Sequence, residues 1–453
     1  MSNEQRRRLL DLPAETLHEI LRYLRAETPS ILPSDLCRVS LTCKRLSYLA
    51  QEHLYHRYHA ELETSEEPTY QLIRTLERRP EFKALIKHVS ITCSGHAWPV
   101  PVMRAATEAD ALIGAAEVRG YPNISALWHS LRSGLGDAMS AYLSLLLPKL
   151  EVLNVRGAEV CADVPSCVLD VLCSAALRPW WCGLHGFCQL SVLELTFQSF
   201  TDIPGALFTI PSLRKVCLGN VYFATAEPSR WTCRPYTSPV TELSLRVHEY
   251  GAPEMRTVLQ SFAELREFRL DTLRVPVNVA RMPSSIYPAL ETQKHSLERI
   301  AVLTYDCYSY KPLGAWPIPV MYPMPSLRDF IKLRGLALTD AALVGNGTNG
   351  FHHWHNEKTV TLQYLSKMFP PSLECFSHVT WGGDYHETFA GVDKQGTRDS
   401  RWPDIWSALA EKALFPSLRK VKQLYYTNNG GDWDLLHEIW PRHTGKRTDD
   451  TVS

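Results

Sequence analysis

The sequence lacks several features that would point to a particular class of protein, and the first of these is net charge. Its 453 residues carry 48 Lys and Arg against 48 Asp and Glu, so the formal net charge is zero. A chain without net charge has no overall field that attracts nucleic acid or an anionic membrane surface. We therefore expect no nucleic-acid partner, and we interpret the basic run 6–8 as part of a solvated polar leader.

Long hydrophobic runs are also missing. The most apolar segment, residues 141–147, ends at Pro148 and is much shorter than the roughly 18 residues of a membrane span. Asp11 and Glu15 interrupt the apolar stretch that a secretory signal would need. We expect no membrane association and no secretion, and therefore a cytoplasmic and/or nuclear protein whose 12 cysteines are reduced thiols.

Motifs that carry chemistry are scarce. Residues 345–350 fit Gly-x-Gly-x-x-Gly, but the acidic residue that a dinucleotide site needs about 20 residues later is missing. The histidines of 352–355 are too close together to give tetrahedral zinc without distant partners. The cysteines of 161–188 form no Cys-x-x-Cys pair, and Cys167 and Cys173 fall on an apolar helical pattern. We expect no enzyme, no cofactor and no metal site.

The N-terminal 55 residues, in contrast, carry a strong helical signal. Pro13 suits the first turn of a helix, and Glu15 in that turn complements the helix dipole. The apolar residues that follow at helical spacing are Leu17, Ile20, Leu21 and Leu24. After a Pro-rich break at 27–34, Ser34 can cap a second short helix and Thr42 a third. Three short helices bury too little surface to be stable alone, so this segment needs a partner surface.

The pattern resembles the F-box. Residues 10–24 contain the Leu-Pro-x-Glu start and an apolar helix, and residues 34–55 contain a second helix followed by the segment 43–46, Cys-Lys-Arg-Leu. The resemblance implies a three-helix domain that docks onto a Skp-type adaptor, and through it onto a cullin. The predicted adaptor contacts are Leu12, Pro13, Leu17, Ile20, Leu21, Leu36, Val39 and Leu46. In the alternative interpretation, the same apolar stripe packs onto the following domain as a helical cap.

A degenerate repeat fills the rest of the chain. The phrase Leu-x-x-apolar-x-apolar recurs at 147–157, 187–197, 210–220, 238–247, 262–273, 295–305, 324–335, 370–381 and 415–426. Its alternating tail predicts a short strand with one face inward, and the leading residue, Leu327 in the phrase 324–335, packs beneath it. Helical patterns precede several phrases, at 124–147 with a break near Gly134 and Gly136, at 255–262 and at 362–369.

Helix and strand in alternation predict an α/β protein: an N-terminal three-helix F-box followed by an irregular solenoid of short parallel strands and helices, similar to leucine-rich repeats. A doubly wound α/β domain is the rival, and it would need strands buried on both faces. The predicted divisions are a polar leader 1–8, the F-box-like module 9–58, a linker or helix 59–80, the solenoid 81–440 and a polar tail 441–453.

Aromatic residues concentrate in the long insertions after the strands. If the repeats stack in register, these insertions share one rim of the solenoid, where Tyr and Trp supply rigid contact area. Packing of these rings against their own scaffold is the alternative. The predicted substrate contacts are Trp231, Tyr236, Tyr308, Tyr310, Trp316, Trp381, Tyr385, Tyr425 and Tyr426.

These expectations together favour a non-catalytic adaptor. The F-box-like module would hold a Skp-type adaptor of a cullin–RING ubiquitin ligase, and the solenoid would hold a substrate protein. Two alternatives remain: an interaction scaffold outside any ligase, and a small-molecule receptor or enzyme that uses the aromatic rim as a pocket.

Overall fold

The computed structural model describes residues 12–26, 33–61, 67–93, 121, 123–132, 136–158, 166–178, 187–222, 231–247, 251–272, 284–304, 323–339, 342–343, 362–381 and 415–426. The chain divides into two compact units. Unit 1 is Met1–Phe200 with Ala206–Lys215, and unit 2 is Thr201–Gly205 with Val216–Ser453. No helix in the described ranges is both long enough and apolar enough to cross a bilayer.

Unit 1 begins with the helices α1 (Ala14–Ala26), α2 (Pro33–Ser40) and α3 (Lys44–Tyr55). Neither of the two predicted cap residues caps its helix. Helix α2 already begins at Pro33, so Ser34 lies inside it. The N-cap of α3 is Cys43, whose Sγ accepts the N–H of Leu46 at 3.5 Å. Thr42 cannot serve because its hydroxyl donates to the carbonyl of Val39 at 2.7 Å and so closes the preceding turn.

Four parallel strands follow in unit 1, and their order in the sheet is their order in the chain. They are β1 (Arg57–Glu61), β2 (His88–Thr92), β3 (Val152–Ala158) and β4 (Val192–Asp202). The elements between and after them are α4 (Glu67–Arg78), η3 (Pro80–Ala84), α6 (Ile124–Arg132), α7 (Gly136–Leu146), α8 (Cys167–Leu177) and η4 (Gly205–Thr209). Helix α6 ends at Arg132 and α7 begins at Gly136, and the predicted interruption at Gly134 lies outside the described residues. Strand β1 starts only two residues after α3 ends, so the sheet begins earlier than the repeated phrases indicated.

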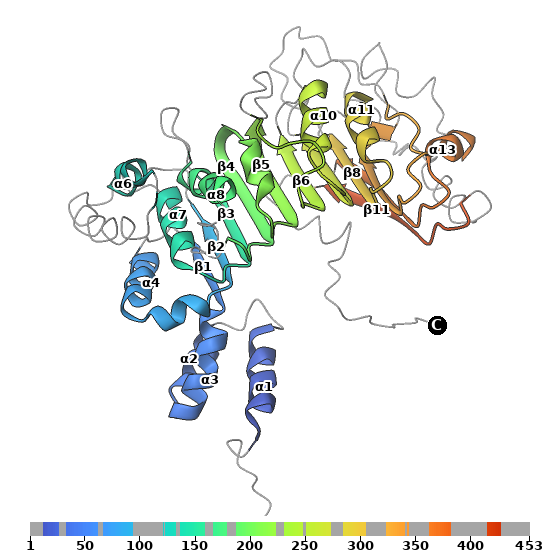
Figure 1. Ribbon diagram of the computed structural model, residues 1–453. Coiled ribbons are helices and arrows are strands. Elements are labelled where there is room, and N and C mark those ends of the chain that lie inside the picture. Colours follow the sequence, from blue (N-terminus) through green and yellow to red (C-terminus); the bar gives the residue numbers. More distant parts are fainter. Residues whose placement is uncertain are drawn as a thin grey trace, which may run out of the picture. The chain divides into compact units, whose positions relative to one another are not determined.

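Unit 2 continues in the same manner (Figure 1). Its strands are β5 (Lys215–Tyr222), β6 (Glu242–Val247), β7 (Glu267–Thr272), β8 (Arg299–Thr304), β9 (Gly335–Thr339), β10 (Cys375–Trp381) and β11 (Lys420–Tyr426). The helical elements are α10 (Ala252–Gln260), η5 (Ser284–Ile286), α11 (Tyr287–Leu290), η6 (Glu291–Gln293) and α13 (Leu362–Met368). From β6 to β11 each strand pairs in parallel with the next along the chain. A doubly wound sheet reverses its strand order at a switch point, and neither unit does so among its described strands.

The leading residue of each phrase sets where its strand begins. Strand β3 starts two residues after Leu150, and β7 starts two residues after Leu265, both of which are fully buried. Position 240 in the phrase 238–247 is Val240, which fills the same place before β6. The prediction for 324–335 was wrong by six residues. Leu333 leads β9, whereas the carbonyl of Leu327 accepts the N–H of Phe330 at 3.0 Å in a turn.

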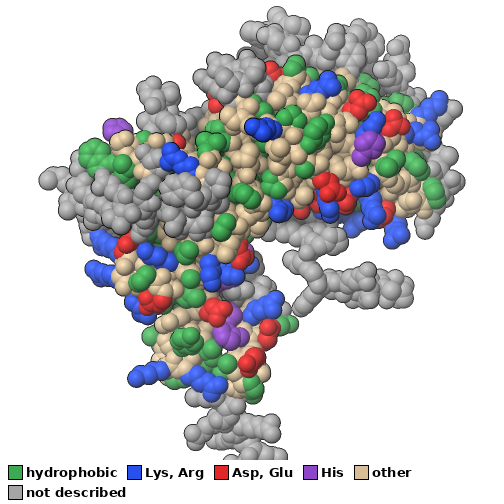
Figure 2. All heavy atoms as spheres, viewed as in Figure 1, with side chains coloured by type: hydrophobic (Ala, Val, Ile, Leu, Met, Phe, Trp, Pro, Cys, Tyr) green, Lys and Arg blue, Asp and Glu red, His purple; other side chains and the backbone are tan. Residues whose placement is uncertain are grey.

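The residue just before each strand forms a second regular feature, which we call the pre-strand ladder. In unit 2 the members are Thr241, Arg266, Glu298, Arg334, Glu374 and Arg419. From Arg266 on, the N–H of each member donates to the carbonyl of the preceding member at 2.8 Å. After Thr241 the charges alternate in sign along the ladder. Arg334 and Glu374 approach to 3.8 Å. Figure 2 shows acidic and basic side chains gathered along an edge of the strand-bearing part of the chain.

The alternating pattern predicted strands with one buried and one exposed face, and this prediction is wrong for β6 and β7. Every residue of β6 and β7 after the first is buried, including the charged Arg246, Arg269 and Asp271. Asp271 makes this possible because it accepts two hydrogen bonds from Arg269, at 2.8 Å each, and its Oδ2 lies 4.0 Å from Arg246. A buried charge is tolerated when it is paired in this way. The charged positions therefore belong to a buried ion cluster and not to a solvated sheet face.

Candidate functional site: an exposed face of the N-terminal helices

Helices α1, α2 and α3 form a hydrophobic core of their own. Leu17 and Leu21 on α1 meet Leu36 on α2, and Leu46, Leu49 and Ala50 on α3 complete the cluster. All six are less than 9% exposed. The burial of one Leu side chain contributes about 1.5–3 kcal/mol, so this cluster accounts for the apolar stripe that the sequence displays.

Polar contacts fix the helices around that core. The guanidinium of Arg45 donates to the carbonyl of Leu12 at 3.0 Å and ties the start of α1 to α3. Nδ1 of His18 and Nε2 of His53 are 3.1 Å apart across the same two helices. The N–H of Leu17 donates to the carbonyl of Pro13 at 3.1 Å, so Pro13 opens the first turn as predicted. These contacts fix the orientation of the helices and leave the outer surface of the module exposed.

Large apolar side chains remain on that outer surface. Leu41, in the turn after α2, is 85% exposed and Tyr48 on α3 is 77% exposed. Ile20 and Tyr23, one turn apart on α1, are 38% and 58% exposed. Single exposed apolar residues are common, but several on one small helical module indicate a surface that another protein covers.

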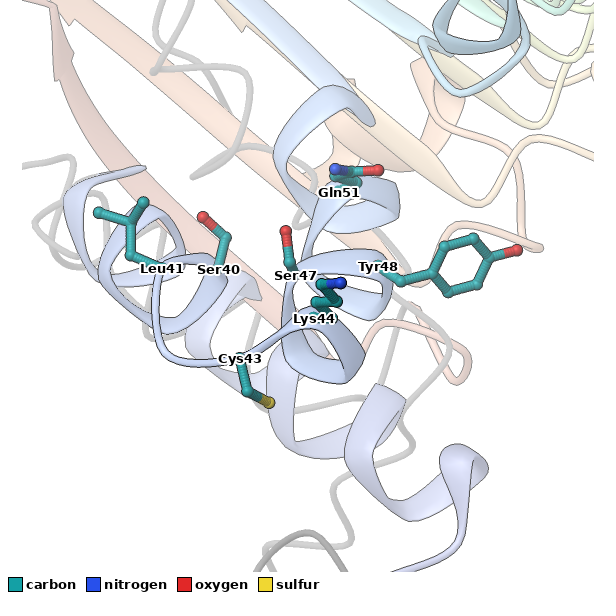
Figure 3. Close-up of a pocket in the computed structure, with 7 residues that line it drawn as sticks. All are labelled: Ser40, Leu41, Cys43, Lys44, Ser47, Tyr48 and Gln51. Carbon is teal, nitrogen blue, oxygen red and sulfur yellow. The ribbon is translucent and has the colours of Figure 1, made fainter.

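Leu41 and Tyr48 border a shallow, open hollow of about 470 Å³ between α2 and α3. It is lined by Ser40, Leu41, Cys43, Lys44, Ser47, Tyr48 and Gln51. The two apolar side chains lie on opposite sides of it, and Ser47 and Lys44 stand between them (Figure 3). We call these seven residues the docking face. Exposed aromatic side chains such as Tyr48 are enriched in protein interfaces.

The eight predicted adaptor contacts divide into three groups. Leu17, Leu21, Leu36 and Leu46 lie in the core of the module, and Leu12 and Val39 pack partly against it. Only Pro13 and Ile20 are exposed. The four core residues therefore stabilise the module itself, and the residues that a partner could contact directly are the exposed ones.

Sequence reasoning missed Leu41, Tyr48 and Tyr23. A signal for Tyr48 was present, because it is out of phase with the stripe formed by Leu46, Leu49 and Ala50. Leu41 carried no such signal, since a lone Leu in a turn has no periodicity.

The predicted substrate contacts are only partly within the described residues. Trp231 is half-buried and its Nε1 donates to Oγ of Ser261 at 2.9 Å. Tyr236 is 57% exposed. Trp381 and Tyr426 are register partners at the ends of β10 and β11, next to Tyr425. Tyr308, Tyr310, Trp316 and Tyr385 lie outside the described residues.

Burial raises the pKa of both thiols on α8, Cys167 and Cys173. Burial, with a smaller contribution from Asp137, raises the pKa of the Cys167 thiol from 9.0 to about 12. A thiol with that pKa stays protonated at neutral pH and is a poor nucleophile. Within the described ranges no group of three or more His, Cys, Asp or Glu side chains is arranged to hold a metal ion.

A helical module with its own core and an exposed apolar face defines a protein-docking module. Residues 9–61 match the F-box-like family. An F-box-like domain is typical of protein-interaction adaptors, above all those of Skp–cullin–F-box ligases. Among curated proteins no match to the chain was found.

Proposed function

We propose that this protein is the substrate-recognition adaptor of a Skp–cullin–F-box type ubiquitin ligase. The observation that carries the proposal is the F-box-like match at 9–61 together with the docking face that α2 and α3 leave exposed. The module holds a Skp-type adaptor, the adaptor holds the cullin, and the rest of the chain holds a substrate protein. The protein itself makes and breaks no bond.

The energetics of docking favour Leu41 and Tyr48 as anchors. Each is more than three-quarters exposed, so nearly the whole side chain can still be removed from water. Covering one such side chain contributes about 1.5–3 kcal/mol. Ser47 and Gln51 supply hydrogen-bonding groups at the border of the same hollow, as the rim of a protein interface requires.

The strand-bearing part is, in this proposal, an irregular solenoid similar to leucine-rich repeats. The sequential parallel strands, the buried residue two positions before each of them and the pre-strand ladder support it. Such an array presents loops on one rim for a substrate. Holding the substrate near the ubiquitin-charged enzyme raises its effective concentration, and this alone accelerates transfer. The setting is cytoplasmic and/or nuclear.

The test is co-purification with a Skp-type adaptor and a cullin. The double variant Leu41→Glu, Tyr48→Glu places two charges on the docking face and should abolish adaptor capture. The matched control is Leu177→Glu, Ile331→Glu, since both side chains are 66% exposed and lie elsewhere. It should leave adaptor capture unchanged.

Each outcome decides between functions. Capture of adaptor and cullin that only the first variant abolishes supports the ligase adaptor. Capture of the adaptor without the cullin identifies an interaction scaffold outside any ligase. Absence of the adaptor from the wild-type preparation refutes both.

A further inference from the structure

An exposed tyrosine in unit 2 is held in a strained backbone conformation. Tyr236 has φ 58°, in the left-handed region that favours glycine, and its side chain is 57% exposed. Asn220 is the one other non-glycine residue with positive φ in the described ranges, and Asn tolerates this region better than Tyr. A bulky residue keeps such a conformation only where the surroundings enforce it.

The surroundings of Tyr236 do enforce it. Its N–H donates to the carbonyl of Gln260 at 2.8 Å, and the N–H of Thr237 donates to the carbonyl of Ser261 at 3.0 Å. The indole of Trp231 donates to Oγ of Ser261 at 2.9 Å. Residues 231–238, which we call the Tyr236 loop, are thus fastened to the end of α10. A fastened loop presents its side chain without the entropic cost of ordering it on binding.

The approach of Gly205 fastens the other side of the loop. A Cβ atom at Gly205 would lie 2.9 Å from the backbone nitrogen of Thr232 and 3.0 Å from that of Cys233. Only glycine permits this contact. Cys233 itself is buried, so the loop is anchored from within while Tyr236 points outward.

Two exposed arginines lie on the two segments that these hydrogen bonds join, the Tyr236 loop and α10. Arg234 lies two residues before Tyr236 in the same loop, and Arg256 lies one helical turn before Gln260 on α10. Both are exposed, and within the described part of the chain neither forms an ion pair. The acidic residue that follows α10, Glu264, already faces Arg266 at 3.5 Å. The loop and the end of α10 therefore carry one exposed aromatic ring on a fixed backbone and two exposed guanidinium groups.

We propose that the Tyr236 loop and the outer side of α10 bind an acidic polypeptide segment of the substrate. The guanidinium groups of Arg234 and Arg256 bind its carboxylates, since a planar guanidinium can donate two parallel hydrogen bonds to one carboxylate. The ring of Tyr236 covers an apolar or aromatic side chain between them. This inference rests on the proposed function, because it names the class of substrate that the adaptor recruits.

The experiment measures binding of a fluorescein-labelled random copolymer of Glu and Tyr to the full chain by fluorescence anisotropy. A copolymer of Lys and Tyr and a single-stranded oligonucleotide serve as comparison probes. We expect the Glu–Tyr copolymer to bind most tightly and its affinity to fall as salt is added. Equal or tighter binding of the oligonucleotide would indicate a generic polyanion surface and overturn the proposal.

Two variants test the residues. The reversal Arg234→Glu, Arg256→Glu should weaken binding at least tenfold, while the matched reversal Arg328→Glu, Lys332→Glu, also at exposed residues of unit 2, should change it less than twofold. Tyr236→Asn removes the ring but suits the backbone, so it should lower affinity while the melting temperature stays equal or rises. Equal losses from both charge reversals would overturn the proposal.

Adaptor capture is measured on the same variants. If the arginine reversal spares copolymer binding while the adaptor is still captured, this inference fails and the proposed function stands. If the adaptor is never captured but copolymer binding depends on Arg234 and Arg256, the acidic-segment surface stands and the ligase role fails.

Discussion

Separate alanine substitutions of Leu17 and Tyr48 distinguish the core of the N-terminal module from its docking face. Both residues belong to the three-helix module, Leu17 on α1 and Tyr48 on α3. Leu17 is 1% exposed, whereas Tyr48 is 77% exposed. One substitution therefore acts on the folded state alone, and the other acts on the complex.

The magnitudes differ accordingly. Leu17→Ala removes a fully buried side chain and should lower the free energy of unfolding by about 2–5 kcal/mol. Tyr48→Ala touches a surface position and should change that free energy by no more than about 0.5 kcal/mol. In the complex the adaptor would cover the Tyr48 side chain, and its removal should cost about 1.5–3 kcal/mol of binding free energy. This corresponds to a roughly tenfold to hundredfold rise in Kd for the Skp-type adaptor.

The assay pairs urea unfolding with calorimetric titration of purified adaptor. The contrast itself is the test: Leu17→Ala should shift the unfolding curve, and Tyr48→Ala should shift only the titration. Unchanged affinity in Tyr48→Ala would refute the assignment of the docking face. Unchanged stability in Leu17→Ala would refute the separate core.

Three further substitutions or treatments probe unit 2 and the buried thiol. Asp271→Ala should destabilise the fold by about 3–5 kcal/mol in urea unfolding, because it leaves the guanidinium of Arg269, 2% exposed, without its carboxylate; unchanged stability would contradict the ion cluster. Gly205→Ala should cost about 1–3 kcal/mol, since its Cβ would lie 2.9 Å from the nitrogen of Thr232; a neutral result would mean that the loop moves freely. Iodoacetamide at pH 8 should leave Cys167 unmodified in the folded chain, because its pKa of about 12 keeps the thiol protonated; rapid labelling there, read by mass spectrometry, would show that the site opens.

Helices were predicted well where the apolar spacing was long and strict. The stripe Met255, Val258, Leu259 became the buried side of α10, with all three fully buried. In this segment the local pattern and the tertiary packing require the same structure.

The strands were harder because their signal is short. Strands β1 and β2 were missed since Tyr55 and Ile86, not Leu, stand two residues before them. Two leucines compete in the phrase 324–335, and only the pairing of β9 with β8 selects Leu333 over Leu327. Pairing partners lie far apart in the chain, so no local pattern could have made this choice.

The candidate site shows a different limit. The apolar stripe of Leu17 and Leu21 looks the same in sequence whether another protein or a neighbouring helix covers it. In the structure α3 covers it, through Leu46 and Leu49. Periodicity marks residues that are buried, and it does not say by which molecule.

The alternating charges of the pre-strand ladder constrain how the series of parallel strands can change in length. From Arg266 to Arg419 each backbone step joins residues of opposite sign, and an exposed pair contributes about 0.2–1 kcal/mol. Deleting the strand segment that carries Glu298 would make Arg266 and Arg334 neighbours in the ladder and place two like charges side by side. Deleting two consecutive strand segments, each with its ladder residue, would keep the charges alternating. The alternation of charge is therefore preserved only when strand segments are gained or lost in pairs.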